Sequence, residues 1–544
     1  MKKIFFILLA TFSLFQAQAQ KGRFYGGYEG YLQLYQNDTP TSFVAPSDKF
    51  RTMNYITANY AYSHFKAGLQ YEAFLPSPLL GYNPDLKGNK LATYYIDFKK
   101  NNLDITAGYF YDQFGSGLIF RAWEDRQIGI NNAIRGIRAK YTISSVGQLT
   151  AFTGNQRLGF ELSKSTLSGV NADVSLSDIL DMYDVNIKTG FSYINRYQET
   201  ASANPDLKPY TGSYSSRIDV DAGNFYGNFE YDYKESDARA TNNVLLDQVL
   251  FDGNAWLLNL GYAKKGIGFN ATFRRLENIQ MYSERLLEGN LYNSGIVNFV
   301  PGLTKQHDFN LANIYVYQAQ PSISFGEEKV GEIGGQMDIF FRFKRKSALG
   351  GKYGTKVAVN FSRWHGLNAT FDYDRKIYRA DFIKPGKLYF QDINFEVRKK
   401  ISRSSKMIFS YINLIYNKLK LEGEGDMVHA GIGVVDFEHK FSDGNSGHIQ
   451  LEHMNTKQDK GNWVSGLVEY NFSPEFGAYI NNMYNYGNKD KKILYFNVGM
   501  NYVHNATRLA LSYGRQRGGL LCVGGVCRYV PSSKGVTFTI STSF

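Results

Sequence analysis

The sequence predicts an all-β fold in which a single large antiparallel β-barrel occupies the chain after a short N-terminal leader. Three observations predict it. Apolar and polar residues alternate over much of the 544-residue chain, short and long connections alternate between the predicted strands, and aromatic residues reach 16% of the composition. A transmembrane barrel needs these residues for its two aromatic girdles, and its polar lumen lowers the mean hydropathy. From composition alone, a large secreted β-propeller or solenoid is the alternative.

The leader has the three regions of a secretory signal peptide. Lys2-Lys3 are basic, residues 4–15 are apolar, and Ala17-Gln18-Ala19 form a cleavage site. We therefore expect a signal peptide at residues 1–19 and one barrel domain at residues 20–544. No later stretch reaches the roughly 18 apolar residues that a membrane helix requires, so the mature chain is predicted to be either soluble or a barrel.

The charge balance is moderately basic. The whole chain has a formal net charge of +12, and removal of Lys2 and Lys3 with the leader lowers it by two to +10. Acidic residues are nearly as frequent and are interspersed with the basic ones, whereas nucleic-acid binding requires a basic cluster. The excess favours anionic lipid head groups or an anionic solute, and we expect no nucleic acid as a partner.

The last ten residues show the alternation most clearly. Val536, Phe538, Ile540, Thr542 and Phe544 fall on one face of a strand, and Thr or Ser residues lie between them. One face suits lipid and the other suits water, and the same split recurs at residues 185–196, 267–274 and 494–502. The terminal Phe544 resembles the signal that the barrel-assembly machinery recognises. We therefore expect this machinery, outer-membrane lipid and lipopolysaccharide as partners.

Two kinds of connection separate the predicted strands. Tight links with turn-forming residues lie near residues 63–64, 100–102, 144–147, 221–224, 264–266, 442–445 and 504–505. Long polar connections lie between them, at residues 37–49, 76–90, 115–127, 276–305 and 364–387. Short turns on one rim and long loops on the other are typical of outer-membrane barrels. About eleven short links, one with a possible helix at residues 177–183, predict about 24 strands, within a range of roughly 20 to 26, with both termini on the short-turn rim.

Two segments resemble an uncharacterised family of outer-membrane barrels from Bacteroidota. The first is the stretch Gln-Phe-Gly-Ser-Gly-Leu at residues 113–118, with Arg121, the Glu-Asp-Arg run at 124–126 and Gly129. The second is residues 518–531, which contain Cys-Val-Gly-Gly-Val-Cys, followed by the strand that ends in Phe. The resemblance covers the mature chain. It implies an outer-membrane location in such an organism and implies no activity.

The only two cysteines, Cys522 and Cys527, flank Val-Gly-Gly-Val at residues 523–526. If Gly524-Gly525 form a two-residue turn, the cysteines become a non-hydrogen-bonded pair about 4.5 Å apart at Cα. That separation accepts a disulfide, and an exported chain meets an oxidising compartment. A zinc site is the alternative, but two thiolates without a nearby His or further Cys leave it half built. We predict a disulfide, and we expect no metal and no cofactor.

One connection combines both charge signs with an aromatic ring: Arg121, Trp123, Glu124, Asp125 and Arg126 lie between glycines. If this loop folds into the lumen, it forms a constriction comparable to the charged rings that set pore selectivity. The alternative is a salt-bridged loop on the surface. The Glu-Glu-Lys run at 327–329 with Glu332 is a further acidic patch. Its spacing matches no calcium loop, and we interpret it as a solvated strand end.

A hydrolytic site has weak support in the sequence. His453, with Glu452 and Asn455 nearby, could join Ser465 on the next strand, because such chemistry needs a His near a Ser and a carboxylate or Asn. A barrel with this many Ser and Asn residues offers similar coincidences elsewhere. We therefore predict that the chain is not an enzyme.

Transport or permeation across the outer membrane is the leading functional hypothesis, through a polar and slightly basic lumen. A barrel of more than about 16 to 18 strands encloses water unless something fills it. We expect the long loops, chiefly residues 276–305 and 364–387, or a plug or surface protein partner to close it. The alternatives are a non-conducting platform for partners and, remotely, a hydrolase embedded in the barrel.

Overall fold

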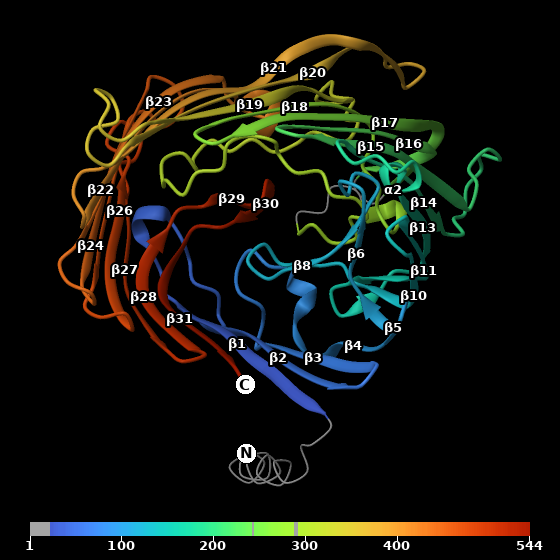
Figure 1. Cartoon of the computed structure of the whole chain (residues 1–544), viewed down its shortest axis with the longest axis horizontal. Helices are drawn as coiled ribbons and strands as arrows, with labels where there is room; N and C mark the ends of the chain where they lie inside the picture. The colour runs from blue at the N-terminus through green and yellow to red at the C-terminus, as the bar shows by residue number, and fades with distance from the viewer. Residues whose placement is uncertain (1–21, 242–243, 288–291) are drawn as a thin grey trace.

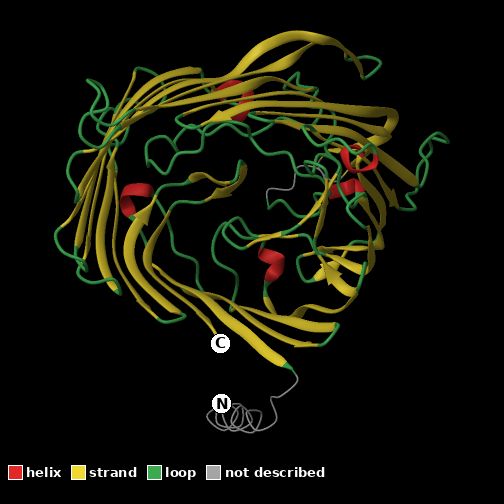
Figure 2. Cartoon of the chain, viewed as in Figure 1, coloured by secondary structure: helices red, strands yellow, loops and turns green. Residues whose placement is uncertain are grey.

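The computed structural model describes residues 22–241, 244–287 and 292–544, and these form a closed all-β barrel (Figures 1 and 2). The main sheet holds 25 strands, of which the short β12 (Glu161–Leu162) pairs only with β11 and the other 24 form the wall. The predicted strand number is therefore confirmed. The predicted signal peptide at residues 1–19 lies outside the described residues.

The first half of the wall consists of β1 (Arg23–Tyr35), β2 (Phe50–Tyr62), β3 (Phe65–Leu75), β4 (Gly88–Lys100), β5 (Leu103–Phe110), β10 (Ile134–Ile143), β11 (Gly147–Leu158), β13 (Thr166–Ser175), β14 (Asn186–Tyr197), β15 (Tyr210–Ala222), β16 (Phe225–Thr241) and β17 (Val244–Lys264). The second half consists of β18 (Ile267–Glu277), β19 (Gly331–Phe343), β20 (Thr355–Asp372), β21 (Ile377–Lys400), β22 (Ser405–Asn417), β23 (Met427–Lys440), β24 (Ser446–Thr456), β25 (Trp463–Asn471), β26 (Phe476–Tyr484), β27 (Leu494–His504), β28 (Thr507–Gln516) and β31 (Ser533–Ser543).

Each wall strand pairs antiparallel with the next, and β31 closes the ring against β1. On the predicted lipid face of β31, Phe538 lies opposite Leu32 of β1 and Leu511 of β28. Directly paired residues of antiparallel strands share a face. The next position, Thr539, lies opposite Tyr31 of β1, so the closing seam alternates between an apolar outer row and a more polar inner row.

An apolar belt runs around the outside of the wall. Nearly every strand presents a large, solvent-exposed apolar side chain there, which a water-soluble protein would bury. Representatives from successive strands are Ile56, Leu69, Leu91, Ile137, Leu149, Val170, Phe191, Ile218, Leu260, Phe273, Ile339, Val359, Ile393, Phe409, Val435, Ile449, Val464, Ile480, Val498 and Leu511. Among the described residues, no helix is long and apolar enough to cross a membrane.

The two rims differ as predicted. The tight links lie on one rim, together with α2 (Leu176–Ile179), which lies at the predicted helix. The opposite rim holds the longer connections, the short strands β6 (Asp112–Phe114), β7 (Phe120–Ala122), β8 (Glu124–Asp125), β9 (Ile130–Asn131), β29 (Gly519–Val523) and β30 (Val526–Val530), and the helix α3 (Lys418–Glu422). We call these the short-turn rim and the long-loop rim.

One predicted loop is wrong. Residues 364–387 are the extended ends of β20 and β21, joined by a turn at residues 373–376, and Phe371 pairs with Tyr378 near the tip. The Tyr378 ring stacks on Phe251 of β17 at 5.5 Å, so the hairpin is stabilised by packing with a distant strand. Many polar and charged residues in this segment predict a loop, whereas the paired strands continue through them. The structure accommodates Pro385 where the strand register shifts, a position at which proline is tolerated.

Candidate functional site

Three connections of the long-loop rim fold into the barrel, and we call their described residues the plug: 111–133, 278–330 and 517–532. Figure 1 shows β6, β8, β29 and β30 inside the ring of wall strands. The three segments hold one another by backbone hydrogen bonds. Arg121 N donates to Val297 O at 2.9 Å, Phe299 N donates to Gly117 O at 2.8 Å, and Gly302 N donates to Gly525 O at 2.8 Å.

The plug packs against an apolar patch on the inner wall, which we call the apolar seat. Its Phe309, Leu311, Tyr315 and Tyr317 are buried in one cluster with wall residues Trp364, Phe390, Ile412, Leu414, Tyr416, Val428, Ala430, Ile432 and Val434. The inner faces of β22 and β23 are therefore apolar where the plug covers them. At this part of the wall, plug residues take the place of water as the contact of the inner face, and the polar lumen elsewhere stays a prediction.

One plug histidine lies beside this seat. His307 Nε2 lies 3.2 Å from Asn394 Oδ1 of β21, and its ring stacks on Phe309 at 5.3 Å. Burial lowers the pKa of His307, because desolvation disfavours the charged ring. The ring therefore remains neutral near pH 7, which suits its contact with the apolar seat.

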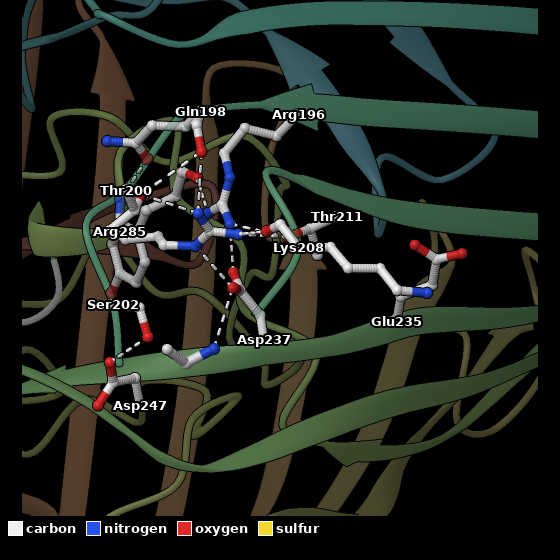
Figure 3. A network of polar contacts seen from close by, with 12 residues as sticks. Arg196, Gln198, Thr200, Ser202, Lys208, Thr211, Glu235, Asp237, Asp247 and Arg285 are labelled. Atoms are coloured by element: carbon white, nitrogen blue, oxygen red, sulfur yellow. Dashed lines mark hydrogen bonds and ion pairs between the residues drawn. The ribbon is translucent and has the colours of Figure 1, made fainter. Parts of the chain in front are cut away.

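An arginine of the long loop forms the first polar anchor (Figure 3). Arg285 Nε donates to Asp237 Oδ1 of β16 at 2.8 Å, and its Nη atoms donate to Gln198 O at 3.0 Å and Lys208 O at 2.7 Å. The same aspartate pairs with Arg196 of β14. The Arg285 side chain is only 1% exposed. A buried arginine with these partners fixes the loop to β14, β16 and the connection before β15.

A second polar anchor lies at the start of β19. Glu332 Oε1 accepts from Arg274 Nη2 of β18 at 2.6 Å, and its Oε2 accepts from Gln320 N at 2.8 Å and from the Tyr317 hydroxyl. Both Arg274 and Glu332 are at most 1% exposed. The interpretation of Glu332 as part of a solvated strand end is wrong, because the plug covers this strand end and removes its water.

A third polar anchor joins the plug to the opposite wall. Glu452 of β24 accepts the backbone N–H groups of Asn310 and Leu311 at 2.9 and 2.8 Å, and Asn310 Nδ2 donates to Ser465 Oγ at 2.9 Å. His453 lies on the other face of the strand, where it contacts the Tyr486 hydroxyl at 2.7 Å. The structure therefore separates His453 from Ser465, so the residues proposed for hydrolysis do not form a site.

The five residues of the predicted constriction lie in the plug, inside the wall. Arg126 pairs with Glu29 of β1 and with Glu124, and its guanidinium lies 4.4 Å from the Tyr55 ring. Asp125 Oδ1 accepts the N–H groups of the next turn at 2.9 and 3.2 Å. The charges of this loop are thus used to attach it, and its role as a constriction stays a prediction.

Arg121 differs from the other charged residues of that loop because its guanidinium contacts aromatic rings. Its guanidinium lies 4.5 Å from the Trp123 ring and 4.0 Å from the Phe299 ring, between the two. Burial lowers the pKa of Arg121, although an arginine so placed keeps its charge. Arg121 therefore joins two plug segments through cation–π contacts.

The predicted disulfide is present. Cys522 and Cys527 are bonded and lie opposite each other in the β29–β30 hairpin, with a Cα separation of 4.0 Å. Gly524 and Gly525 have φ of +57° and +79°, the left-handed pair that a tight two-residue turn requires. The bond stiffens the plug segment that contacts Gly302.

Removal of the disulfide should loosen this hairpin without unfolding the barrel. In a Cys522→Ser, Cys527→Ser variant, we expect a local loss of about 2 kcal/mol of chain-entropy stabilisation for so short a loop. Hydrogen exchange should become faster at residues 519–530 and remain unchanged in β24. Unchanged exchange in the hairpin would show that its packing alone keeps it rigid.

The sequence does not predict that these polar residues anchor the plug to the wall. The alternation at residues 267–274 places Arg274 on the polar face of its strand, but nothing local indicates that Glu332 or Arg285 will meet a buried partner. No group of three or more His, Cys, Asp or Glu side chains in the described chain is placed to hold a metal ion.

A family model matches this chain over residues 1–544, and its description is a family of unknown function, DUF6029. The chain belongs to DUF6029. No curated protein matches the DUF6029 chain. Among solved structures it is similar to a ferric enterobactin receptor mutant of Pseudomonas aeruginosa, with 10% identity, 96% of this chain and 80% of that chain covered, and a TM-score of 0.44.

Two other solved structures are also similar to this chain. The P pilus usher translocation pore shares 8% identity over 96% of this chain and 99% of its own, with a TM-score of 0.44. The outer-membrane transporter YddB of Escherichia coli shares 8% identity over 95% and 81%, with a TM-score of 0.38. Likeness at this level carries no information on the function of the DUF6029 chain.

Proposed function

We propose that this chain is a transport barrel of the outer membrane that is closed at rest by its own plug. The observation that supports the proposal is the plug, which lies inside a wall of 24 strands and contacts it at β16 on one side and at β24 on the other. A wall of this size encloses water unless something fills it. A closure built from rim loops keeps the permeability barrier intact and remains able to open.

The apolar belt supports the membrane location. Hydrocarbon is the one solvent in which a continuous ring of exposed Leu, Ile, Val and Phe is favourable. A closed barrel also leaves no strand edge without hydrogen bonds, as a span through lipid requires. Both properties hold around the described wall strands.

Exposed charged side chains on the inner wall near the short-turn rim support the proposal of a water-filled passage in this part of the barrel. Lys406 and Glu438 pair at 2.6 Å with side chains 56% and 39% exposed, and Arg398, which pairs with Glu396, is 56% exposed. These side chains point inward from β21, β22 and β23, on the face that carries the apolar seat farther up. The passage we propose is therefore lined by both charge signs below the plug.

A non-conducting platform is the second candidate, and the apolar seat favours it. A plug segment with Phe309, Leu311 and Tyr317 buried costs several kcal/mol to remove from the wall, because each such side chain contributes about 1.5 to 3 kcal/mol when it is buried. If no interaction supplies the free energy that is needed to move the plug, the barrel stays closed and only presents its long-loop rim to partners.

A reversible crosslink between plug and wall tests the proposal. The Asn310 and Ser465 side chains are in contact, so an Asn310→Cys, Ser465→Cys variant should form a disulfide that fixes the plug. In proteoliposomes, we expect transient opening of the plug to let the intact chain pass small solutes. The oxidised variant should lose most of this flux, and reductant should restore it. The intact chain with and without reductant is the control, because it contains the natural disulfide. Absence of flux from the intact, folded chain would favour the platform.

A further inference from the structure

A cavity of about 480 Å³ lies at the long-loop rim, between the plug and the loop that joins β3 to β4. We call it the mouth pocket. Its lining includes the rings of Tyr82 and Tyr529, the prolines 78, 84 and 531, and the basic side chains of Arg51 and Lys87. Its volume falls within the range of sites that hold small ligands.

The mouth pocket is a built structure, because its floor is fixed by side chains from other segments. Leu80 N donates to the Tyr35 hydroxyl at 2.9 Å, and Arg51 Nη1 donates to Pro78 O at 3.1 Å. Arg528 of the disulfide hairpin donates to Gly81 O at 2.8 Å, and its guanidinium lies 4.0 Å from the Tyr82 ring. The strand pairing, the disulfide and Arg528 therefore hold the pocket walls in place.

The charged side chains that line the mouth pocket, Arg51 and Lys87, are both basic. Arg51 is neutralised by Asp48 at 2.7 Å, whereas Lys87 is exposed and forms no ion pair within the part of the chain that the structure describes. Arg528 donates to the backbone carbonyls of Gln127 and Gly81, and Gly81 lines the pocket; the charge of Asp125 acts on Arg528, but the two form no ion pair among the described residues. Asp85 is the acidic residue nearest Lys87 in sequence, and it does not line the cavity.

From these observations we infer that the mouth pocket binds an anionic solute that presents the apolar face of a ring. Tyrosine and proline faces accept the apolar face of a ring, and Lys87, with the field of Arg528, attracts the negative group. An aromatic carboxylate and an acidic sugar share this chemistry. Binding itself needs no open pore, and only the role of the pocket as an entry site for the solute rests on the proposed transport function.

Equilibrium binding to the purified full chain in detergent micelles tests the inference. The probes are 4-hydroxybenzoate and trigalacturonate as ring anions, 4-hydroxybenzyl alcohol as the neutral ring, and inorganic phosphate as an anion without a ring. We expect one or both ring anions to bind about fivefold more tightly than the neutral ring and phosphate, the upper range for one exposed ionic contact. The two ring anions distinguish the aromatic from the sugar source.

Matched variants locate the binding. Lys87→Gln should weaken ring-anion binding by about fivefold, and Tyr529→Ala should weaken it by about tenfold, while Lys457→Gln, an exposed lysine on the β24–β25 loop, should have no effect. Equal binding of the neutral ring, absence of ring-anion binding, or an unaffected Lys87→Gln variant would overturn the inference. If the chain binds ring anions but passes no solute in proteoliposomes, the mouth pocket is confirmed as a binding site and the proposed transport function is wrong.

Discussion

Replacement of residues 278–330 by a short Gly-Ser linker should turn the closed barrel into a wide channel. Glu277 at the end of β18 pairs with Gly331 at the start of β19, so a tight turn can join the two strands without disturbing the wall. We expect single-channel conductance in planar bilayers to rise by at least about tenfold over the intact chain, because a wall of this size encloses more than the water channel of 16–18-stranded porins.

The same linker at the 373–376 turn is the matched control. That turn lies at the tip of the β20–β21 hairpin, and none of its residues belongs to the plug, so conductance should remain that of the intact chain. Folding of each variant can be checked by its resistance to heat and detergent during electrophoresis. A folded variant that lacks 278–330 and still does not conduct would show that the other two plug segments suffice to close the barrel.

Loss of the Glu332 carboxylate should destabilise the chain more than any other single change at the plug. In Glu332→Ala, the Arg274 guanidinium stays buried without its partner, and the Tyr317 hydroxyl and Gln320 N–H lose their acceptor. Breaking a buried ion pair in this way costs about 3–5 kcal/mol. Urea unfolding in lipid vesicles, followed by tryptophan fluorescence, should show the loss as a lower midpoint.

Two further variants give this prediction its controls. Glu396→Ala removes the partner of Arg398, which is 56% exposed, and should cost less than about 1 kcal/mol. An Arg274→Leu, Glu332→Leu double variant removes both buried charges and should recover part of the stability lost in Glu332→Ala. If Glu332→Ala and Glu396→Ala shift the midpoint equally, water reaches the Glu332 anchor and the plug does not seal β19.

The seam between β31 and β1 shows why the barrel could be predicted. Alternation places Phe538 and Thr539 on opposite faces whatever the rest of the chain does, and Phe538 then lies between Leu32 and Leu511 in the structure. The hairpin of Cys522 and Cys527 is equally local, since a Gly-Gly turn fixes the register of its two cysteines. Predictions fail where the decisive contact is distant, as for the β20–β21 hairpin and Glu332.

Local patterns predict the strand wall, its rims and the disulfide, because period-2 alternation and turn residues act over a few positions. Contacts between distant residues decide which loops fold inside the wall, and these contacts are visible only in the three-dimensional structure. Asn310 meets Glu452 across 142 positions and Arg285 meets Asp237 across 48, and no local pattern encodes such pairs. The sequence does not distinguish a polar residue of an exposed loop from one that anchors the plug, because the burial of either residue depends on the distant residues that pack against it.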